Sequence, residues 1–170
     1  MDYEVRRASI EDAEAISTVI IAALRESNTR DYPPEVIVQV ETSFSPANVK
    51  DLMAKRWVFV ASFDGQLVAT ASLHSTAVRS AFVSPQHQGR GVGRMLMDAI
   101  HARAASAGIK ALRVPSSITA EGFYRTLGYE KIRDELHGEE RTIVMEKSLS
   151  AEPVTAPPES PPTDSNTPAT

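Results

Sequence analysis

Apolar residues along the chain follow two different spacings, which predicts a mixture of helices and strands. They recur every third or fourth residue over 9–24 and again over 91–107, which is the pattern of a helix with one buried face. Over 57–74 and 77–83 they fall in short runs rich in branched and aromatic residues, which is typical of strands. The Asp64-Gly65 pair divides the first of these runs and indicates a tight hairpin.

The remaining segments complete a domain in which helices and strands alternate. We expect a strand near 3–5, a helix after the Ser45-Pro46 cap, a strand at 109–114, a short helix at 119–128 and two final strands on either side of 137–138. The run VIVQV, which follows two consecutive prolines, fits a helix or a strand. The order β-α-α-β-β-β-α-β-α-β-β predicts a mixed α/β domain with one twisted sheet flanked by helices.

Composition changes abruptly near the C-terminus. Six of the eleven prolines fall within the last twenty residues, which contain no aromatic residue, lysine or arginine. Such a segment buries too little apolar surface to offset the entropy of ordering it. We therefore expect one folded domain over 1–149 and a disordered, proline-rich acidic tail over 150–170, which is inert rather than a site that recruits a partner.

Composition also excludes several classes of protein. The chain has 170 residues, enough for one core, and no cysteine, so disulfides, thiolate metal sites and a cysteine nucleophile are excluded. The net charge of −4 disfavours nucleic-acid binding through a broad basic surface. Neither a signal-peptide pattern nor an apolar stretch of membrane-spanning length occurs, so we expect a cytoplasmic protein that binds neither membrane nor metal.

The most distinctive motif is the segment QGRGVGR over 88–94, which comes directly before a predicted helix. Backbone N–H groups at a helix start carry partial positive charge, and glycines let the chain curl closely around an anion. Arg90 and Arg94 add positive charge beside this position. The segment lacks the lysine of a P-loop and the later acidic residue of a dinucleotide fold. It indicates a phosphate-bearing ligand, with a glycine-rich turn and two solvated arginines as the alternative.

With its context, this motif resembles the GCN5-related N-acetyltransferase (GNAT) superfamily. A hairpin, the strand ending AFVSP, the Q-x-x-G-x-G motif and the later segment SITAEGFYRTLGYEKI follow one another as in that family. The similarity covers 57–133, and the order of elements fits over 1–148. The resemblance implies the GNAT fold, acetyl-CoA as co-substrate, and transfer of its acetyl group to a primary amine by direct attack.

The resemblance also implies which residues contact the cofactor. In this family the glycine loop holds the pyrophosphate, and the preceding strand splays from its neighbour and pairs with the pantetheine arm. Here these positions are Ala81, Phe82, Val83, Gln88, Gly89, Arg90, Gly91, Val92, Gly93 and Arg94. Ser117 lies where many members have an asparagine, and either it bonds to the cofactor or one of the two serines there satisfies the start of the short helix.

Proton transfer is the part of the chemistry where this chain departs from the family pattern. Tyr124 matches the tyrosine that often protonates the leaving thiolate, with a packed tyrosine as the alternative. Ala77 stands where many members place a glutamate base, and no carboxylate occurs from 65 to 97. His74 is the candidate base, and Glu41, another acid of the N-terminal half or a water relay are its alternatives.

The acceptor is the least determined part of the prediction. Tyr32 lies on a proline-stiffened segment between the first two helices, where such folds bind the acceptor, and is the candidate substrate contact. The near-neutral domain favours a small-molecule amine over a basic peptide, with a protein N-terminus still open, and the protein is expected as a monomer or homodimer. The missing glutamate motivates a non-catalytic acyl-CoA-binding module as a second function, and a nucleotide-binding domain of another fold is a third.

Overall fold

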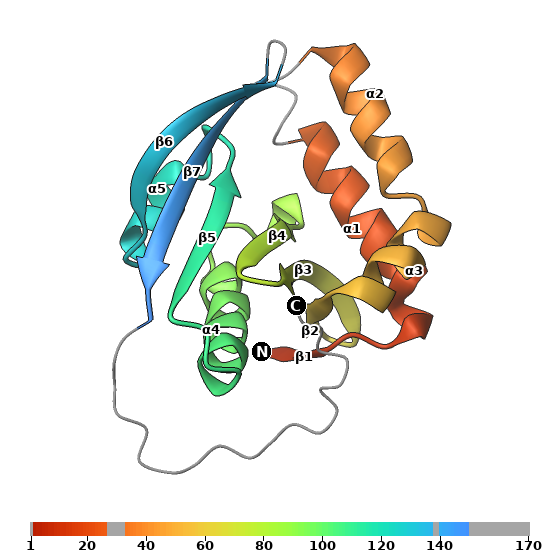
Figure 1. The fold of residues 1–170 in the computed structure, drawn as a ribbon. Coiled ribbons are helices and arrows are strands. Elements are labelled where there is room, and N and C mark those ends of the chain that lie inside the picture. The colour runs from red at the N-terminus through yellow and green to blue at the C-terminus, as the bar shows by residue number, and fades with distance from the viewer. Residues whose placement is uncertain (1, 27–32, 138–139, 150–170) are drawn as a thin grey trace.

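A computed structural model describes residues 2–26, 33–137 and 140–149, and within them the chain forms a mixed sheet flanked by helices (Figure 1). The strands are β1 (Tyr3–Arg7), β2 (Trp57–Phe63), β3 (Gln66–His74), β4 (Ala77–Val83), β5 (Ala111–Ser116), β6 (Glu130–His137) and β7 (Glu140–Ser148). The helices are α1 (Ala13–Glu26), α2 (Pro34–Ser43), α3 (Pro46–Lys55), α4 (Val92–Ser106) and α5 (Glu121–Thr126), with 3-10 turns η1 (Ile10–Asp12) and η2 (Pro85–His87). The predicted mixed α/β architecture is confirmed. The tail from 150 onward lies outside the described residues.

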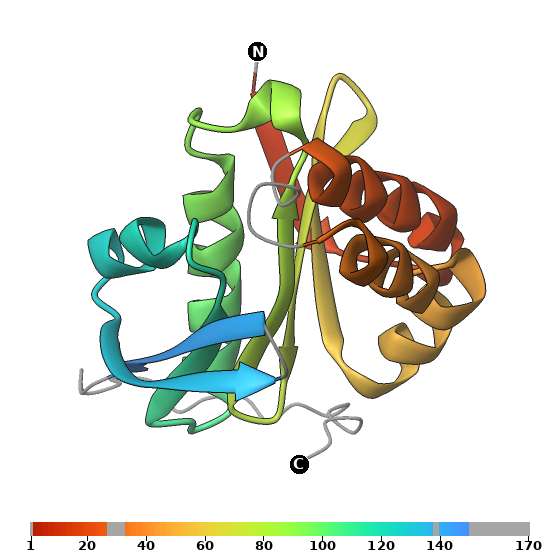
Figure 2. The same cartoon turned by 90° about the horizontal axis from the view of Figure 1, so that it is seen from above.

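The sheet has the strand order β1-β2-β3-β4-β5-β7-β6 and separates two layers of helices. Figure 2 shows α1 and α2 on one side of β4, and α4 and α5 on the other. On the α4 side, Leu96, Met97 and Ile100 are buried against the sheet. On the α1 side, Ile16 and Ile20 are buried in a second cluster. Two apolar layers therefore hold β3 and β4 rigidly at the centre of the domain.

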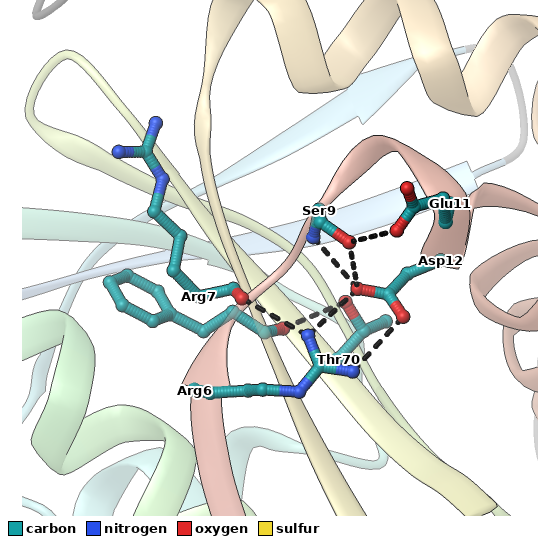
Figure 3. Close-up of polar contacts among 7 residues, drawn as sticks. Arg6, Arg7, Ser9, Glu11, Asp12 and Thr70 are labelled. Atoms are coloured by element: carbon teal, nitrogen blue, oxygen red, sulfur yellow. Dashed lines mark hydrogen bonds and ion pairs between the residues drawn. The ribbon is translucent and has the colours of Figure 1, made fainter.

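The junction between β1 and α1 is fixed by a local ion pair (Figure 3). Nη1 of Arg6 lies 2.9 Å from Oδ2 of Asp12, and Nη2 lies 3.0 Å from Oδ1. The same carboxylate accepts the backbone N–H of Ser9 at 2.7 Å, as an acidic group near a helix start commonly does. The hydrogen bond from Arg6 is the main cause that lowers the pKa of Asp12.

The run VIVQV forms part of a helix, which settles the one segment that the pattern left open. Pro33 occupies the N-cap position of α2, and Pro34 is its first residue, where the missing N–H removes no intrahelical hydrogen bond. Ile37 is buried, whereas Val38 is exposed. The branched residues are therefore compatible with a helix that buries only one narrow face, and the predicted order of elements lacked this helix.

The neighbouring strands β4 and β5 separate along their length. They run parallel and pair where Ala77 faces Arg113, and the N–H of Arg113 donates to the carbonyl of Thr76 at 3.0 Å. No further pair of residues joins these two strands within their described lengths. The splayed strand that the resemblance implied is thus confirmed, and its free edge faces the gap.

A bulge in β4 lies beside this gap. Thr70 pairs with Phe82 and Ser72 pairs with Arg79, so β4 has one more residue than β3 in this interval. Ser80 has the positive φ of 51°, which a non-glycine residue rarely adopts. Bulges of this kind redirect side chains and are common beside active sites.

Candidate functional site

A cavity with a volume of about 510 Å³ lies between β4 and the start of α4. Most residues with an implied cofactor contact line it, namely Ala81, Phe82, Val83, Gln88, Gly89, Gly91, Val92, Gly93, Arg94 and Ser117. Arg90 is exposed and is not among its lining residues. Except for Arg90, every residue that the resemblance implies for cofactor binding therefore lines this cavity.

The glycine loop takes a backbone shape that favours glycine at two positions. Gly89 has a φ of 76° and Gly91 a φ of 89°, and Gly91 is the N-cap of α4. A Cβ atom at either position would meet nothing within 4 Å, so the requirement is conformational rather than steric. The first N–H groups of α4 open at this cavity, and a helix start of this kind accommodates an anion such as a pyrophosphate.

Gly93 leaves little room for a side chain, because α4 and α5 approach each other closely there. A Cβ atom at Gly93 would lie 3.2 Å from Cζ of Phe123 and 3.8 Å from Cγ2 of Val83. Gln88 closes the loop from the other end, since its Nε2 donates to the carbonyl of Val83 at 3.1 Å. The amide side chain thus ties the glycine loop to the end of β4.

A second cavity of about 140 Å³ lies in the gap between β4 and β5. Arg79 and Ser80 line its β4 side, and Pro115 lies on its β5 side. It shares five lining residues with the larger cavity: Ala81, Phe82, Ser117, Ala120 and Tyr124. The two cavities therefore meet at a common wall, to which the start of α5 contributes.

Tyr124 stands at this common wall. Its side chain is buried, with 5% of the residue exposed, and its ring packs against Phe123 and Tyr129 with centroids 5.1 Å and 5.6 Å away. Its hydroxyl makes no hydrogen bond to any residue that the structure describes. Burial raises the pKa of Tyr124, which keeps the phenol protonated. A buried donor without a protein partner, facing two cavities, is suited to bond a ligand.

Tyr129 provides an internal contrast, because its hydroxyl is satisfied within the protein. The hydroxyl oxygen lies 2.9 Å from Nε2 of His101 on α4. Burial, and then the nearby Tyr124, raise the pKa of Tyr129. Burial is also the main cause that lowers the pKa of His101. The two tyrosines thus share an environment, but only Tyr124 has its hydroxyl unpaired among the described residues.

Ser117 has a structural partner as well as a place in both cavities. Its Oγ accepts the backbone N–H of Ala120 at 3.2 Å, which satisfies the turn before α5. Ser116 is buried, and its hydroxyl donates to the carbonyl of Ser117 at 2.7 Å. The alternative in which a serine satisfies the start of the short helix is therefore seen, as the hydrogen bond from Ala120 to Ser117. The hydroxyl hydrogen of Ser117 can still be donated to a ligand.

The predicted base lies outside both cavities. His74 is exposed at the end of β3 and lines neither cavity. Burial, and then the charges of Arg56, Arg79 and Lys55, lower the pKa of His74. Tyr32 lies outside the described residues.

The acidic alternative, Glu41, is engaged elsewhere. Its carboxylate oxygens lie 2.8 Å and 3.1 Å from the Nε and Nη2 atoms of Arg25, which joins α2 to α1. No acidic residue is among those that line either of the two cavities. A carboxylate base would therefore have to act from outside these described linings or through water. His87, which lines the larger cavity, is hydrogen-bonded through Nδ1 to the hydroxyl of Tyr3 at 2.9 Å.

The positions of two cationic residues, Arg79 and Arg56, were not predicted from the sequence. Arg79, which strand alternation suggests is simply solvated, lines this cavity. Arg56 ends α3 and donates through Nη1 to the hydroxyls of Ser72 and Ser80 at 3.3 Å and 3.0 Å. No local motif announces this arrangement, because it depends on the bulge that turns Ser80 toward α3.

Two searches of the described residues bear on other kinds of site. No group of three or more histidine, aspartate or glutamate side chains in these ranges is placed to hold a metal ion. No helix formed by the described residues is long and apolar enough to cross a membrane. The two adjoining cavities thus remain the leading candidate site.

Comparison with known proteins gives a consistent result. A profile of the acetyltransferase (GNAT) domain matches residues 28–149. The uncharacterized N-acetyltransferase YafP of Escherichia coli strain K12 is 24% identical over 134 residues, which cover 79% of this chain and 85% of that protein. A GCN5-related N-acetyltransferase from Rhodopseudomonas palustris has a TM-score of 0.80 and 25% identity, with 87% of this chain and 96% of that chain covered.

A third relative is similar in fold alone. The PaiA N-acetyltransferase of Thermoplasma acidophilum, solved in complex with coenzyme A, has a TM-score of 0.76 at 19% identity and covers 87% of this chain and 99% of its own. The matched domain spans more than half of the chain and contains β2 to β7, the glycine loop, the lining of the smaller cavity and all of the lining of the larger cavity except Ala23. The protein is therefore an acetyltransferase that belongs to the GNAT family.

Proposed function

We propose that the protein transfers the acetyl group of acetyl-CoA to a primary amine of a small molecule by direct attack. The observation that carries this proposal is the unpaired hydroxyl of Tyr124 at the wall shared by two cavities. One cavity has the size and the anion-binding loop for a phosphate-bearing cofactor, and the other leaves room for a small acceptor. A single proton donor between them suits a reaction in which both substrates are bound together.

The larger cavity fits acetyl-CoA through backbone groups more than through side chains. The N–H groups that follow Gly91 at the start of α4 face the position of a pyrophosphate, and Arg94 lines the cavity beside them. The edge of β4 that does not pair with β5 offers Ala81, Phe82 and Val83 to an extended pantetheine arm. Arg90, exposed at the rim, adds longer-range attraction for the phosphates.

The residues of the shared wall supply the leaving-group chemistry. Acetyl-CoA brings an acetyl thioester, whose carbonyl carbon gains the new bond to the amine nitrogen while its bond to sulfur breaks and the electron pair goes to the thiolate. Tyr124 then donates its phenolic proton to that sulfur and is reprotonated from solvent, while the attacking nitrogen loses a proton to solvent as it becomes the amide. Burial keeps Tyr124 protonated until the thiolate forms, because ionisation of the phenol is costly in this environment.

The ammonium form of the acceptor must lose a proton before attack. His74 remains our candidate base, acting through water because it lines neither cavity. The lowered pKa of His74 keeps its imidazole neutral, and so able to accept a proton, at neutral pH. A base that acts through water gives less acceleration than one in direct contact.

One observation favours a second candidate function, a non-catalytic acyl-CoA sensor. Ala77 stands where many relatives have a glutamate, and no acidic residue is among the described residues that line the cavities. A sensor would keep the cofactor cavity and dispense with the base. It would have no use for the unpaired hydroxyl of Tyr124, which is why we favour the enzyme.

The test combines binding with turnover. Calorimetric titration with acetyl-CoA, with ATP as the control, should give micromolar binding of acetyl-CoA alone. Release of free CoA thiol should then follow when a panel of small primary amines is added. Binding without turnover of any amine would favour the sensor, and absence of acetyl-CoA binding would reject both candidates.

A further inference from the structure

Four basic side chains lie near the bulge in β4, and we call them the basic corner: Lys55, Arg56, His74 and Arg79. Of these four, Arg79 lines the smaller cavity, and Arg56 is linked to it through the hydroxyl of Ser80. Lys55 is the last residue of α3 and Arg56 follows it, His74 ends β3, and Arg79 lies on β4. The positive charges of Arg56, Arg79 and Lys55 all contribute to lowering the pKa of His74. Neither Arg56 nor Arg79 forms an ion pair with any residue in the described ranges.

Arg56 is the most informative member, because it is half-buried and forms no ion pair with the residues that the structure describes. Burial, and then the charge of Arg79, lower the pKa of Arg56. Its Nη1 donates to two neutral hydroxyls, those of Ser72 and Ser80, while its Nε and Nη2 make no hydrogen bond to described residues. A guanidinium withdrawn from water usually meets a carboxylate or phosphate, whose charge and fork of acceptors match its own donors.

The backbone strain in β4 belongs to the same arrangement. Ser80 adopts a φ of 51°, and the bulge places it with Ala81 opposite Ala71. This conformation brings the hydroxyl of Ser80 to Arg56 while Ser80 also lines the smaller cavity with Arg79 and Tyr124. A strained backbone conformation of this kind persists only when the surrounding structure holds it, and such residues cluster at functional sites. The bulge therefore links the uncompensated guanidinium to the cavity that leads to the reacting centre.

We infer that the acceptor amine also carries an oxyanion, a carboxylate or a phosphate, which Arg79 binds at the β4 side of the smaller cavity and which the charge of Arg56 attracts from behind Ser80. This inference rests on the proposed function and specifies its substrate class. The amine of such an acceptor points toward Tyr124, and the oxyanion at its other end points toward the basic corner. Arg79 meets the oxyanion at the cavity surface, and Arg56 adds its charge from behind Ser80.

The same charges select against other acceptors. A polyamine or a lysine-rich peptide would bring further positive charge to a corner that already has no described acidic partner for either arginine, and repulsion of like charges is an effective means of discrimination. A simple alkylamine would leave the guanidinium of Arg56 uncompensated. An amine with a negative group would pair with Arg79 on one side of the smaller cavity and reach Tyr124 on the other.

The test compares amines in pairs that differ in one anionic group. Each pair consists of an amino acid and its primary amide, an ω-amino acid and the alkylamine of the same length, or phosphoethanolamine and ethanolamine. Initial rates of CoA thiol release give kcat and KM for each member with the full-length protein. We expect the oxyanion member of a pair to have the higher kcat/KM by about tenfold or more, because hydrogen bonds to charged groups are the stronger ones. The carboxylate and phosphate pairs show which oxyanion is preferred.

Arginine variants show whether the basic corner is responsible. Arg79→Gln should remove most of the preference through a higher KM with little change in kcat, and Arg56→Gln should act in the same direction. Arg79 is exposed, so its variant keeps the test available if Arg56→Gln disturbs the packing of α3. Arg133→Gln is the matched control, since Arg133 lies on β6, pairs with Glu135 at 2.7 Å and lines neither cavity.

The outcomes separate this inference from the proposed function. If acetyl-CoA binds and neutral amines react as well as their oxyanion partners, or the preference survives both arginine variants, the inference is wrong and the acetyltransferase proposal stands. If no amine turns over, thermal stabilisation of the protein by the same pairs decides. Stabilisation by the oxyanion member that Arg79→Gln abolishes would support the inference, and equal or no stabilisation would overturn it. Failure to bind acetyl-CoA counts against the proposed function alone.

Discussion

The two cavities are built in opposite ways from one chain. The larger one depends on backbone that is contiguous in sequence, from Gly89 to the first turn of α4. The smaller one depends on side chains from distant segments, such as Arg79 on β4 and Tyr124 on α5. Backbone recognition suits a ligand that is the same in every relative, whereas side chains from separate elements can vary with the acceptor. Under the proposed function, this difference would let the fold keep one acyl donor while its acceptor varies.

The largest expected effect lies where the two cavities meet. Tyr124→Phe removes the unpaired hydroxyl, and we expect kcat to fall by about 100-fold or more because the thiolate loses its acid. Stability should hardly change, since that hydroxyl has no hydrogen-bond partner among the described residues. Acetyl-CoA affinity, measured by calorimetry, should also be kept.

Tyr129→Phe is the matched control for this prediction. It removes a hydroxyl that lies 2.9 Å from Nε2 of His101, so it should cost about 1 kcal/mol of unfolding free energy while kcat is kept. The assignment of Tyr124 would be contradicted if the two variants exchanged these effects, or if Tyr124→Phe turned over at the wild-type rate.

A smaller effect is expected from the backbone of the larger cavity. Gly91→Ala introduces a side chain at a φ of 89° without touching any atom within 4 Å. We expect acetyl-CoA affinity to fall by about tenfold as the loop relaxes away from this strained conformation. Kinetic constants for the acceptor should change little, which would separate the backbone-built cavity from the side-chain-built one.

Gly65→Ala provides the control for backbone strain. Gly65 has a φ of 80° in the β2–β3 hairpin, also has nothing within 4 Å of an added Cβ, and lines neither cavity. Both variants should lose about 1 kcal/mol of unfolding free energy, measured with urea. Equal losses of acetyl-CoA affinity in the two variants would show that Gly91 acts through stability and not through the loop.

The pH dependence of turnover tests the base at the acceptor side. Burial first, and then three nearby cations, lower the pKa of His74 from its ordinary value of 6.5. If His74 is the base, kcat/KM should fall only as the pH decreases below that value and the imidazole becomes protonated. His74→Gln should lose this limb and reduce kcat by a few-fold. A wild-type profile in the variant would leave water as the base.

The smallest expected effect is on the pH dependence of stability, through His101, which contacts Tyr129. Burial, then the charge of Lys147, lower the pKa of His101, and Asp98 opposes them. The unfolded chain therefore binds this proton at a higher pH than the folded protein does. Stability from this group is complete above about pH 6.5 and is lost as the pH falls toward the folded pKa. Urea unfolding at a series of pH values should show a shallower decline in His101→Gln than in the wild type.

How well the sequence predicted each region follows from how that region is built. The glycine loop is contiguous in sequence and depends on backbone conformation, so the glycines that predict the loop also form it. The strands around Asp64-Gly65 were predictable for the same reason. The helix α2 was not, because branched residues such as those around Ile37 suit a strand equally well until packing against α1 decides. Its start at Pro34 was the available signal.

The acceptor side could not be predicted because its contacts are non-local. Arg56 meets Ser72 and Ser80 through a bulge in β4, and no residue type around 80 announces that bulge. Arg79 alternates with buried neighbours as an ordinary solvated strand residue would. Tyr124 was identified only through a family resemblance, and its unpaired hydroxyl is a property of the packed structure.

The central claim is that both substrates are bound together on either side of Tyr124. Initial rates measured while acetyl-CoA and an accepted amine are varied together test it most directly. Direct transfer predicts intersecting double-reciprocal lines, with a protein mass unchanged after incubation with acetyl-CoA alone. Parallel lines together with an acetylated protein would show transfer through a covalent intermediate and would contradict the account.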